Sequence, residues 1–266
     1  MSVPLLLKAE TMKIKNLHSY YHLSAYHNED LIEVYKDTVI KALNYPFGYT
    51  TTVLFGENLK SHYHRKKGEF FVENIDSVGA LVKYGENSKV GVLNMASAKT
   101  PGGGVLYGSK AQEEALFRCS NLSVSISKSL YPLPIDQVLV TENAIFFKDK
   151  DYHDLEDAHV ATVITCAAPK LEAGDLDWCR NDYDAIINMK MELILNAALK
   201  YNVETLILGA WGCGVYKNDP TYIATQFLEH LKRDNRHYCY DRIVFAVIND
   251  GNSVGNNYEI FKSIIG

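Results

Sequence analysis

Hydrophobic residues along the chain follow two kinds of pattern. Short apolar runs, rich in β-branched residues and bounded by turn residues, predict buried strands. These runs cover residues 70–75, 80–84, 90–93, 137–141, 144–147, 160–165, 206–208 and 243–247. Apolar residues three and four positions apart predict amphipathic helices over residues 28–44, 112–126, 182–201, 221–233 and 257–264. Strands and helices that alternate in this order are typical of a mixed or mainly parallel sheet with helices on both faces.

Length and composition fit a globular protein. The chain has 266 residues, of which 47% are hydrophobic, and this length suits one large α/β domain. No internal repeat or low-complexity linker divides the sequence. We therefore expect a single domain, with an N-terminal extension over residues 1–68 and a catalytic core over residues 69–266.

Charge and cysteine content narrow the possible partners and compartment. A formal net charge of −5 and a pI near 6.0 give no general attraction to nucleic acid or to an anionic membrane, so a polyanion would have to be bound by local geometry. The five cysteines are odd in number and include no C-x-x-C pair, which argues against a disulfide framework and a zinc site. No apolar run approaches the length of a membrane span. We expect a cytoplasmic protein.

One pair of histidines could suggest a metal or phosphate site. His62 and His64 are two residues apart in a basic segment, but no third ligand accompanies them. A solvated loop is the better interpretation, and we assign no metal.

A glycine-rich segment lies between a predicted strand and a predicted helix. Gly102, Gly103 and Gly104 follow the apolar run 90–93, and we call residues 101–111 the first glycine loop. Glycines let the backbone approach a ligand closely, because no Cβ stands in the way and positive φ is accessible. The next helix begins with Gln-Glu-Glu, so two glutamates lie in its first turn. This pattern predicts a ligand site at the start of that helix.

A second glycine loop, residues 209–220, also follows a predicted strand. It contains Gly209, Gly212 and Gly214 and precedes a helix whose N-terminus can receive phosphate. Ligands of open α/β sheets bind beyond the carboxyl ends of the strands. Two such loops could line one crevice and hold a diphosphate from both sides.

The three glycines, seven intervening residues and Gln-Glu-Glu resemble the signature of the poly(ADP-ribose) glycohydrolases. The flanking residues Asn94, Ala98, Pro101, Ala111 and Leu116 are similar to the compact microbial branch of that family. The second glycine loop also resembles the family's second phosphate-binding loop, so the resemblance runs from about residue 90 to the C-terminus. It implies a macrodomain-like αβα sandwich with a mixed central sheet and an N-terminal helical extension, holding ADP-ribose in a cleft.

The resemblance also implies roles for individual residues. Glu114 matches the family's catalytic acid, and Glu113 matches its ribose-holding neighbour. Asn94 would hydrogen-bond the terminal ribose, and Gln112 would help to fix the loop. The remaining substrate contacts would come from Gly103, Gly104 and Val105 around the ribose and diphosphate, from the backbone N–H groups of Gly212, Cys213, Gly214 and Val215 on the phosphates, and from the aromatic face of Tyr216.

The expected chemistry agrees with one principal carboxyl group. Cleavage of a ribose–ribose O-glycosidic bond requires protonation of the departing 2′-oxygen and then activation of water. Neighbouring side chains on a helix point about 100° apart, so Glu113 and Glu114 do not form the facing pair of an ordinary glycosidase. A helix N-terminus favours the ionised carboxylate, whereas a general acid must start protonated. We expect an exo-acting glycohydrolase that needs no cofactor and is a monomer.

Alternatives remain open for the function and for single residues. The same loops would serve a non-catalytic ADP-ribose reader or a hydrolase of mono-ADP-ribose on protein or nucleic acid. Cys213 has no identifiable base and is better interpreted as a small residue beside phosphate than as a nucleophile. Trp211, Tyr258 and Phe261 are expected in the core, with a minor possibility that Tyr258 or Phe261 stacks on adenine.

Overall fold

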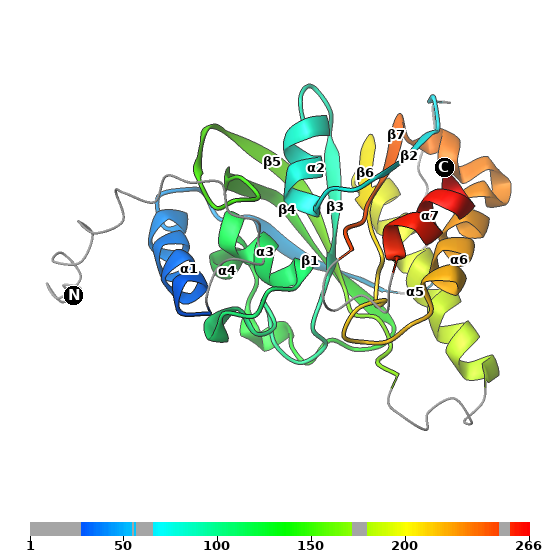
Figure 1. The fold of residues 1–266 in the computed structure, drawn as a ribbon, viewed down its shortest axis with the longest axis horizontal. Coiled ribbons are helices and arrows are strands. Elements are labelled where there is room, and N and C mark those ends of the chain that lie inside the picture. The colour runs from blue at the N-terminus through cyan, green and yellow to red at the C-terminus, as the bar shows by residue number, and fades with distance from the viewer. Residues whose placement is uncertain (1–27, 55, 57–65, 172–179, 250–255) are drawn as a thin grey trace, which may run out of the picture.

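The computed structural model of the chain describes residues 28–54, 56, 66–171, 180–249 and 256–266 (Figure 1). Its strands are β1 (Tyr49–Leu54), β2 (Glu69–Glu73), β3 (Val90–Met95), β4 (Gln137–Lys148), β5 (Asp154–Cys166), β6 (Thr205–Leu208) and β7 (Arg242–Ala246). Its α-helices are α1 (Asn28–Ala42), α2 (Ser77–Tyr84), α3 (Gln112–Cys119), α4 (Leu122–Ser125), α5 (Arg180–Lys200), α6 (Pro220–Lys232) and α7 (Asn257–Ile265). The predicted α/β class is confirmed.

The described strands form one mixed sheet in the order β1-β4-β5-β3-β6-β7-β2. Strands β5, β3, β6, β7 and β2 run parallel to one another. Strands β1 and β4 complete the sheet through antiparallel pairing. Parallel strands place their carboxyl ends at one edge of the sheet, which is where a ligand site is expected.

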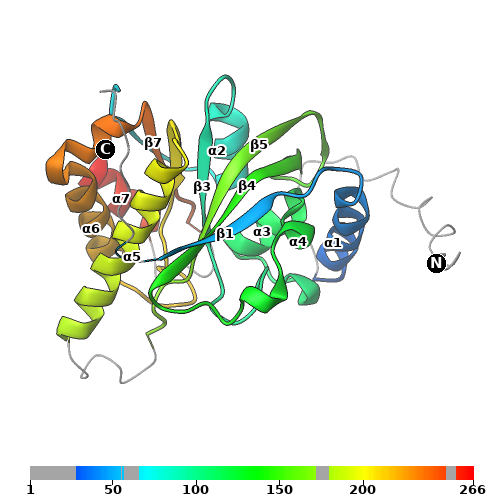
Figure 2. The ribbon, with the colours of Figure 1, turned by 180° about the vertical axis from the view of Figure 1, so that it is seen from behind.

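Helices cover both faces of the sheet. Alternate residues of a strand point to opposite faces, and the buried residues of β7 show this directly. Val244 packs in a cluster with α1, α2, α3 and α4, whereas Ile243 and Phe245 pack in a second cluster with α5, α6 and α7. Helices α2 and α3 lie in front of the sheet in Figure 1, and α5 lies in front of it in Figure 2. The predicted αβα sandwich is therefore confirmed.

Most predicted elements are present, but the segment 80–84 is a helix and not a strand. Asp76 caps α2 by accepting a hydrogen bond from the Gly79 N–H at 2.7 Å. Val78 and Leu81, three positions apart, are buried on one side of the helix. The apolar run thus forms a helical face, a distinction that a run of five residues does not make.

The predicted helix 112–126 is divided into α3 and α4. Backbone at Ser120 is extended and bridges to Phe146 of β4. The Asn121 side chain completes the break, because its Nδ2 donates to the Pro46 carbonyl and its Oδ1 accepts the Ile145 N–H. Conversely, the two predicted strands 137–141 and 144–147 are one strand, β4, with an irregularity between Thr141 and Ala144.

The described part of residues 1–68 contributes to the packed fold. Helix α1 was predicted, and its Leu31 is fully buried. Strand β1 was not predicted, yet it pairs with β4 at the edge of the sheet. The boundary at residue 69 stays a prediction, and residues 1–27 lie outside the described ranges.

Candidate active site

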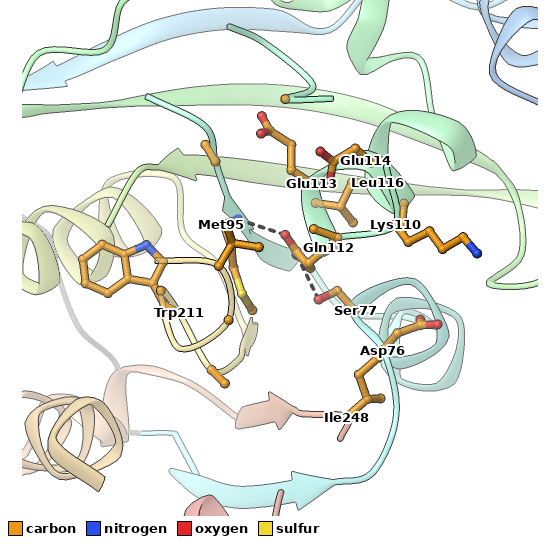
Figure 3. A pocket seen from close by; sticks show the side chains of 18 of the residues that line it. Asp76, Ser77, Met95, Lys110, Gln112, Glu113, Glu114, Leu116, Trp211 and Ile248 are labelled. Atoms are coloured by element: carbon orange, nitrogen blue, oxygen red, sulfur yellow. Dashed lines mark hydrogen bonds between the residues drawn. The ribbon is translucent and has the colours of Figure 1, made fainter. Parts of the chain in front are cut away.

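A cavity of about 370 Å³ lies beyond the carboxyl ends of the parallel strands (Figure 3). The residues that line it follow β3 (Met95 to Ser97), β5 (Ala168), β6 (Ala210 to Gly212) and β7 (Ala246 to Ile248), and others begin α2 (Asp76 to Val78) and α3 (Lys110 to Leu116). Gly103 and Gly104 of the first glycine loop and Gly214, Val215 and Tyr216 of the second complete the wall. Both predicted loops therefore meet at one crevice.

Glu113 is buried and held by three N–H donors. Its Oε2 accepts the Ser97 N–H at 2.6 Å, and its Oε1 accepts the Gly102 N–H at 3.1 Å. Asn94 Nδ2 donates to the same Oε1 at 3.4 Å. These contacts fix the carboxyl group against the backbone that leaves β3.

Glu114 also meets the first glycine loop but keeps one oxygen available. Its Oε1 accepts the Gly104 N–H at 2.8 Å. Its Oε2 has no hydrogen-bond partner among the described residues, although Glu114 is only 7% exposed and lines the cavity. A buried carboxyl oxygen without a partner is costly, so this atom is the most evident candidate for contact with a substrate.

The glycines allow the loop to wrap around the two carboxyl groups. Gly103 has φ +53°, and a Cβ there would lie 2.7 Å from Glu114 Oε1. The N–H groups of Gly103 and Val105 donate to the carbonyls of Thr100 and Gly102. The N–H groups of Gly102 to Val105 thus serve the loop itself and the glutamates. Val105 is buried in the core and does not line the cavity.

Gln112 and Asn94 support the site from beneath. Gln112 Oε1 accepts the Met95 N–H at 2.9 Å, and its Nε2 donates to the Leu93 carbonyl and to Ser77 Oγ. The side chain therefore ties the start of α3 to β3, and it also lines the cavity. Asn94 is fully buried and is not part of the lining. Its place favours an indirect role through Glu113 over the predicted direct contact with ribose.

The second glycine loop lines the cavity and has backbone N–H groups without acceptors in the described part of the chain. The N–H groups of Gly212, Gly214, Val215 and Tyr216 have no acceptor within the described ranges. The Cys213 N–H differs, since it donates to the Ala210 carbonyl at 3.0 Å. Cys213 is also fully buried and does not line the cavity, and burial raises the pKa of its thiol. A nucleophilic role for Cys213 is therefore not supported.

The electrostatics of the paired glutamates follow from their burial. Burial raises the pKa of Glu113 to about 8. The charge of Glu114 adds to this rise, whereas the N–H groups of Ser97 and Gly102 oppose it. At neutral pH the buried pair therefore retains a proton.

Several residues near the cavity were not identified from the sequence. Asp76 and Ser77 line it from the N-terminus of α2, a helix that the sequence pattern assigned as a strand. The Asp-x-x-Gly spacing of the cap was the available signal. Tyr131 has a buried hydroxyl group without a partner in the described part of the chain, and burial followed by the charge of Glu113 raises its pKa. Trp211 is fully buried as predicted, and its Nε1 donates to the Cys166 carbonyl.

The described residues contain neither a metal-ligand cluster nor a helix suited to span a membrane. Among the described residues, no three side chains of His, Cys, Asp or Glu gather as metal ligands. None of the helices placed by the structure has the length and apolar character needed to cross a bilayer.

Solved structures of poly(ADP-ribose) glycohydrolases have a similar fold. Poly(ADP-ribose) glycohydrolase from Thermomonospora curvata is 24% identical, with a TM-score of 0.68 over 90% of this chain and 97% of that chain. The same enzyme bound to the inhibitor ADP-HPD is 23% identical, with a TM-score of 0.67 over 89% of this chain and 97% of that one. The enzyme from Deinococcus radiodurans in complex with ADP-ribose is 25% identical, with a TM-score of 0.64 over 89% and 90%.

The family comparison covers more than half of the sequence. No curated protein matches the chain. The family described as microbial-type PARG, catalytic domain, matches residues 9–146, which include the first glycine loop and both glutamates. This confirms the resemblance drawn from the glycine and glutamate pattern. The chain therefore belongs to the microbial-type PARG catalytic domain family.

Proposed function

We propose that this protein hydrolyses the ribose–ribose O-glycosidic bonds of poly(ADP-ribose) with Glu114 as the general acid/base. Membership of the family makes the chain a glycosidase of the poly(ADP-ribose) glycohydrolase type. One observation carries the assignment to Glu114: its Oε1 is fixed by the Gly104 N–H, and its Oε2 is buried at the cavity without a partner among the residues that the structure describes.

The reaction requires two proton transfers at one carboxyl group. Glu114 donates a proton to the departing 2′-oxygen as the bond between that oxygen and the anomeric carbon breaks. The resulting carboxylate then accepts a proton from water, and the water oxygen bonds to the oxocarbenium-like carbon. Glu114 ends protonated, so the cycle closes without another proton donor.

Glu113 has a supporting role in this proposal. Its three N–H contacts leave it no freedom to approach a reacting atom as a nucleophile. Its raised pKa retains a proton in the pair at neutral pH, which suits a site whose first step is to donate one. Contact between Glu113 and a ribose hydroxyl, the role implied by the family resemblance, stays a prediction.

The second glycine loop suits the diphosphate. Gly214, Val215 and Tyr216 line the same cavity as Glu114, and their N–H groups have no acceptor within the described residues. Neutral backbone donors bind phosphate oxygens without requiring a basic protein surface, which agrees with the net charge of −5. The aromatic ring of Tyr216 is placed at the cavity to pack on ribose or adenine.

Incubation with purified poly(ADP-ribose) in the presence of EDTA tests whether the protein is active and whether it is exo- or endo-acting. We expect free ADP-ribose from the earliest time points, with long chains shortening gradually. Early release of oligomers would indicate endo-action and contradict exo-action. Binding of ADP-ribose without release from polymer would favour a reader, and release only from mono-ADP-ribosylated protein would favour the mono-ADP-ribosyl hydrolase. Continued release in EDTA is expected, because no metal is assigned to the site.

Three predictions about the cellular location and the partners of the protein are not tested by these findings. A cytoplasmic location, a monomeric state and the absence of direct nucleic-acid readout stay predictions. The four described cysteines are free thiols, which supports the first of these predictions, and the net charge of −5 supports the last.

A further inference from the structure

Asn218 lies beneath the second glycine loop, and its side chain is fully buried. Its Nδ2 donates to the carbonyl oxygens of Pro169 at 2.9 Å, Gly212 at 3.0 Å and Tyr216 at 3.5 Å. Its Oδ1 accepts the hydroxyl group of Tyr183 at 2.7 Å. Three carbonyls at one end and a hydroxyl donor at the other define the orientation of the amide.

These bonds pin both ends of the segment that faces the cavity. Asn218 also donates its own N–H to the Gly212 carbonyl at 3.1 Å. Between these anchors, the Lys217 N–H donates to the Gly214 carbonyl at 3.0 Å and closes a turn. The two central residues of such a turn, Val215 and Tyr216, keep their N–H groups outside it. Asn218 therefore holds the backbone conformation that leaves the Val215 and Tyr216 N–H groups available at the cavity wall.

Gly212 is the position that admits the amide. It has φ +77°, and a Cβ there would lie 2.5 Å from Asn218 Nδ2 and 2.7 Å from the Cβ of Ala168. Any larger residue would displace the buried amide from the carbonyl that it holds. Loop and amide thus fit as one unit.

We infer that Asn218 is a positioning residue for the substrate's diphosphate, and that the Tyr183 hydroxyl holds its amide in the working orientation. The inference rests on the proposed function, because it takes ADP-ribose as the molecule whose diphosphate the loop binds. Asn218 does not line the cavity and acts only through the backbone donors.

This role predicts a particular kinetic pattern. Glu114 is held by the first glycine loop, and neither Asn218 nor Tyr183 contacts it through a described hydrogen bond. Diphosphate contacts are remote from the bond that breaks, so they contribute equally to ground-state and transition-state binding. Loss of the loop conformation that Asn218 holds should raise the Kd for ADP-ribose and the KM for polymer while kcat changes little.

The matched variants are Tyr183→Phe and Tyr222→Phe. The two rings pack together with centroids 5.6 Å apart, and each hydroxyl makes a short hydrogen bond. The Tyr183 hydroxyl bonds to Asn218, whereas the Tyr222 hydroxyl bonds to Asp184 Oδ1 at 2.6 Å. Tyr183→Phe should raise the Kd for ADP-ribose about 3- to 10-fold, the usual effect of one hydrogen bond. Tyr222→Phe should leave it within about twofold.

A second variant acts on the amide itself. Asn218→Asp keeps the shape but replaces the donor by an oxygen facing three carbonyls, and it should raise the Kd for ADP-ribose by about 10-fold or more. Calorimetry with ADP-ribose, kcat and KM with polymer, and thermal melting would be measured for each variant. If Asn218→Asp does not fold, the Kd of Tyr183→Phe for ADP-ribose tests the inference without it.

Two sets of results would overturn the inference. One is a Kd for ADP-ribose that Tyr183→Phe leaves within twofold of the wild-type value, and the other is a fall in kcat with Kd unchanged. A wild-type protein that binds ADP-ribose but releases none from polymer would refute the proposed function alone and leave the loop variants informative. A wild-type protein that fails to bind ADP-ribose would refute both.

Discussion

Gly103 lies against both carboxyl groups of the site. An alanine Cβ there would lie 2.7 Å from Glu114 Oε1 and 3.1 Å from Glu113 Oε2. Gly103→Ala should therefore displace both carboxyl groups and lower kcat about 100-fold, the effect expected of a misplacement near 1 Å.

Gly56→Ala is the control for backbone strain alone. Gly56 also has a positive φ, of +83°, but no atom of the described residues, chain neighbours aside, lies within 4 Å of a Cβ built on it. Steady-state kinetics of the two variants should differ widely, while both lose some stability. Equal kcat values for the two would show that the contact with the glutamates does not matter.

The raised pKa of Glu113 predicts a dependence of stability on pH. A carboxyl group whose pKa is about 8 in the folded chain and 4.5 ordinarily binds its proton more tightly when folded. The stability that it contributes is present below pH 4.5 and is lost as the pH rises towards 8. Each pKa unit corresponds to about 1.4 kcal/mol, so the loss should reach a few kcal/mol.

Glu113→Gln removes this titration. The free energy of unfolding of the wild type, minus that of the variant, should fall between pH 4.5 and pH 8.5 in urea denaturation. Glu33→Gln, at an exposed position of α1, is the matched control and should show no such fall. A difference that stays constant with pH would refute the buried, proton-retaining state of Glu113.

At the scale of single residues, the sequence was most informative where spacing has one geometric meaning. Gln-Glu-Glu after a glycine loop placed Glu113 and Glu114 in the first turn of a helix, and the structure places them there. The sequence did not identify Asn218, because an asparagine before Asp-Pro reads as an ordinary turn residue. Its importance depends on carbonyls that only the folded loop brings together.

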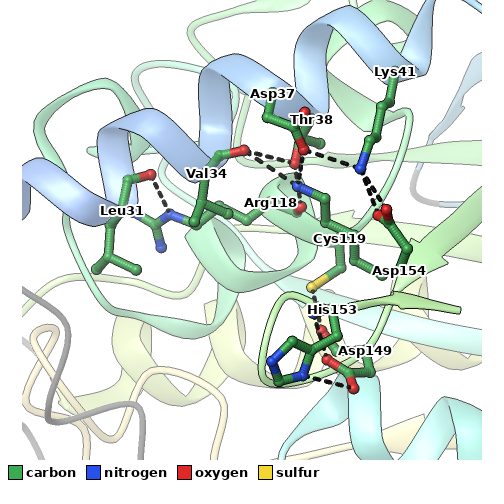
Figure 4. A network of polar contacts seen from close by, with 11 residues as sticks. Leu31, Val34, Asp37, Thr38, Lys41, Arg118, Cys119, Asp149, His153 and Asp154 are labelled. Atoms are coloured by element: carbon green, nitrogen blue, oxygen red, sulfur yellow. Dashed lines mark hydrogen bonds and ion pairs between the residues drawn. The ribbon is translucent and has the colours of Figure 1, made fainter. Parts of the chain in front are cut away.

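Arg118 links several elements through hydrogen bonds of its buried side chain (Figure 4). Its guanidinium is fully buried on α3, with Nε donating to the Leu31 carbonyl of α1 and Nη2 donating to the Ser109 carbonyl of the first glycine loop. Thr38 of α1 returns a hydrogen bond to the Arg118 carbonyl at 2.5 Å. One side chain thus holds α1, α3 and the loop in fixed relation.

Arg118→Leu should therefore lower the free energy of unfolding by about 3 kcal/mol, because the Leu31 and Ser109 carbonyls lose the donor that they share. Lys36→Ala on α1 provides the contrast, since the Lys36–Glu33 ion pair is exposed and such pairs contribute less than about 1 kcal/mol. Urea denaturation measures both variants. A cost for Arg118→Leu no larger than that for Lys36→Ala would contradict the bridging role.

At the scale of elements, the predicted secondary structure was wrong where a local sequence pattern fitted two different structures. The apolar run 80–84 fits a short strand or one face of a short helix, and the Asp76 cap decides for α2. The helical spacing of Leu116, Cys119 and Leu122 continues across the break after α3, and all three are buried as predicted. Only pairing with β4 shows that the helix stops between them.

At the scale of the whole molecule, the alternation of strands and helices was sufficient to predict the three layers. The position of β1 was not predictable in this way. Its Tyr-Thr-Thr-Thr sequence lacks a buried apolar face, and it is held at the sheet edge by pairing with β4. The site itself follows from topology, because parallel pairing brings the segments after β3, β5, β6 and β7 to one cavity.

The central claim is that this cavity performs glycoside hydrolysis through Glu114. The most direct test compares ADP-ribose release from poly(ADP-ribose) by the wild type and by Glu114→Gln, with calorimetric Kd values for ADP-ribose. The glutamine oxygen can still accept the Gly104 N–H, so the Kd should stay within about threefold, whereas kcat should fall about 1,000-fold with loss of the acid/base. Wild-type turnover by Glu114→Gln would contradict the claim.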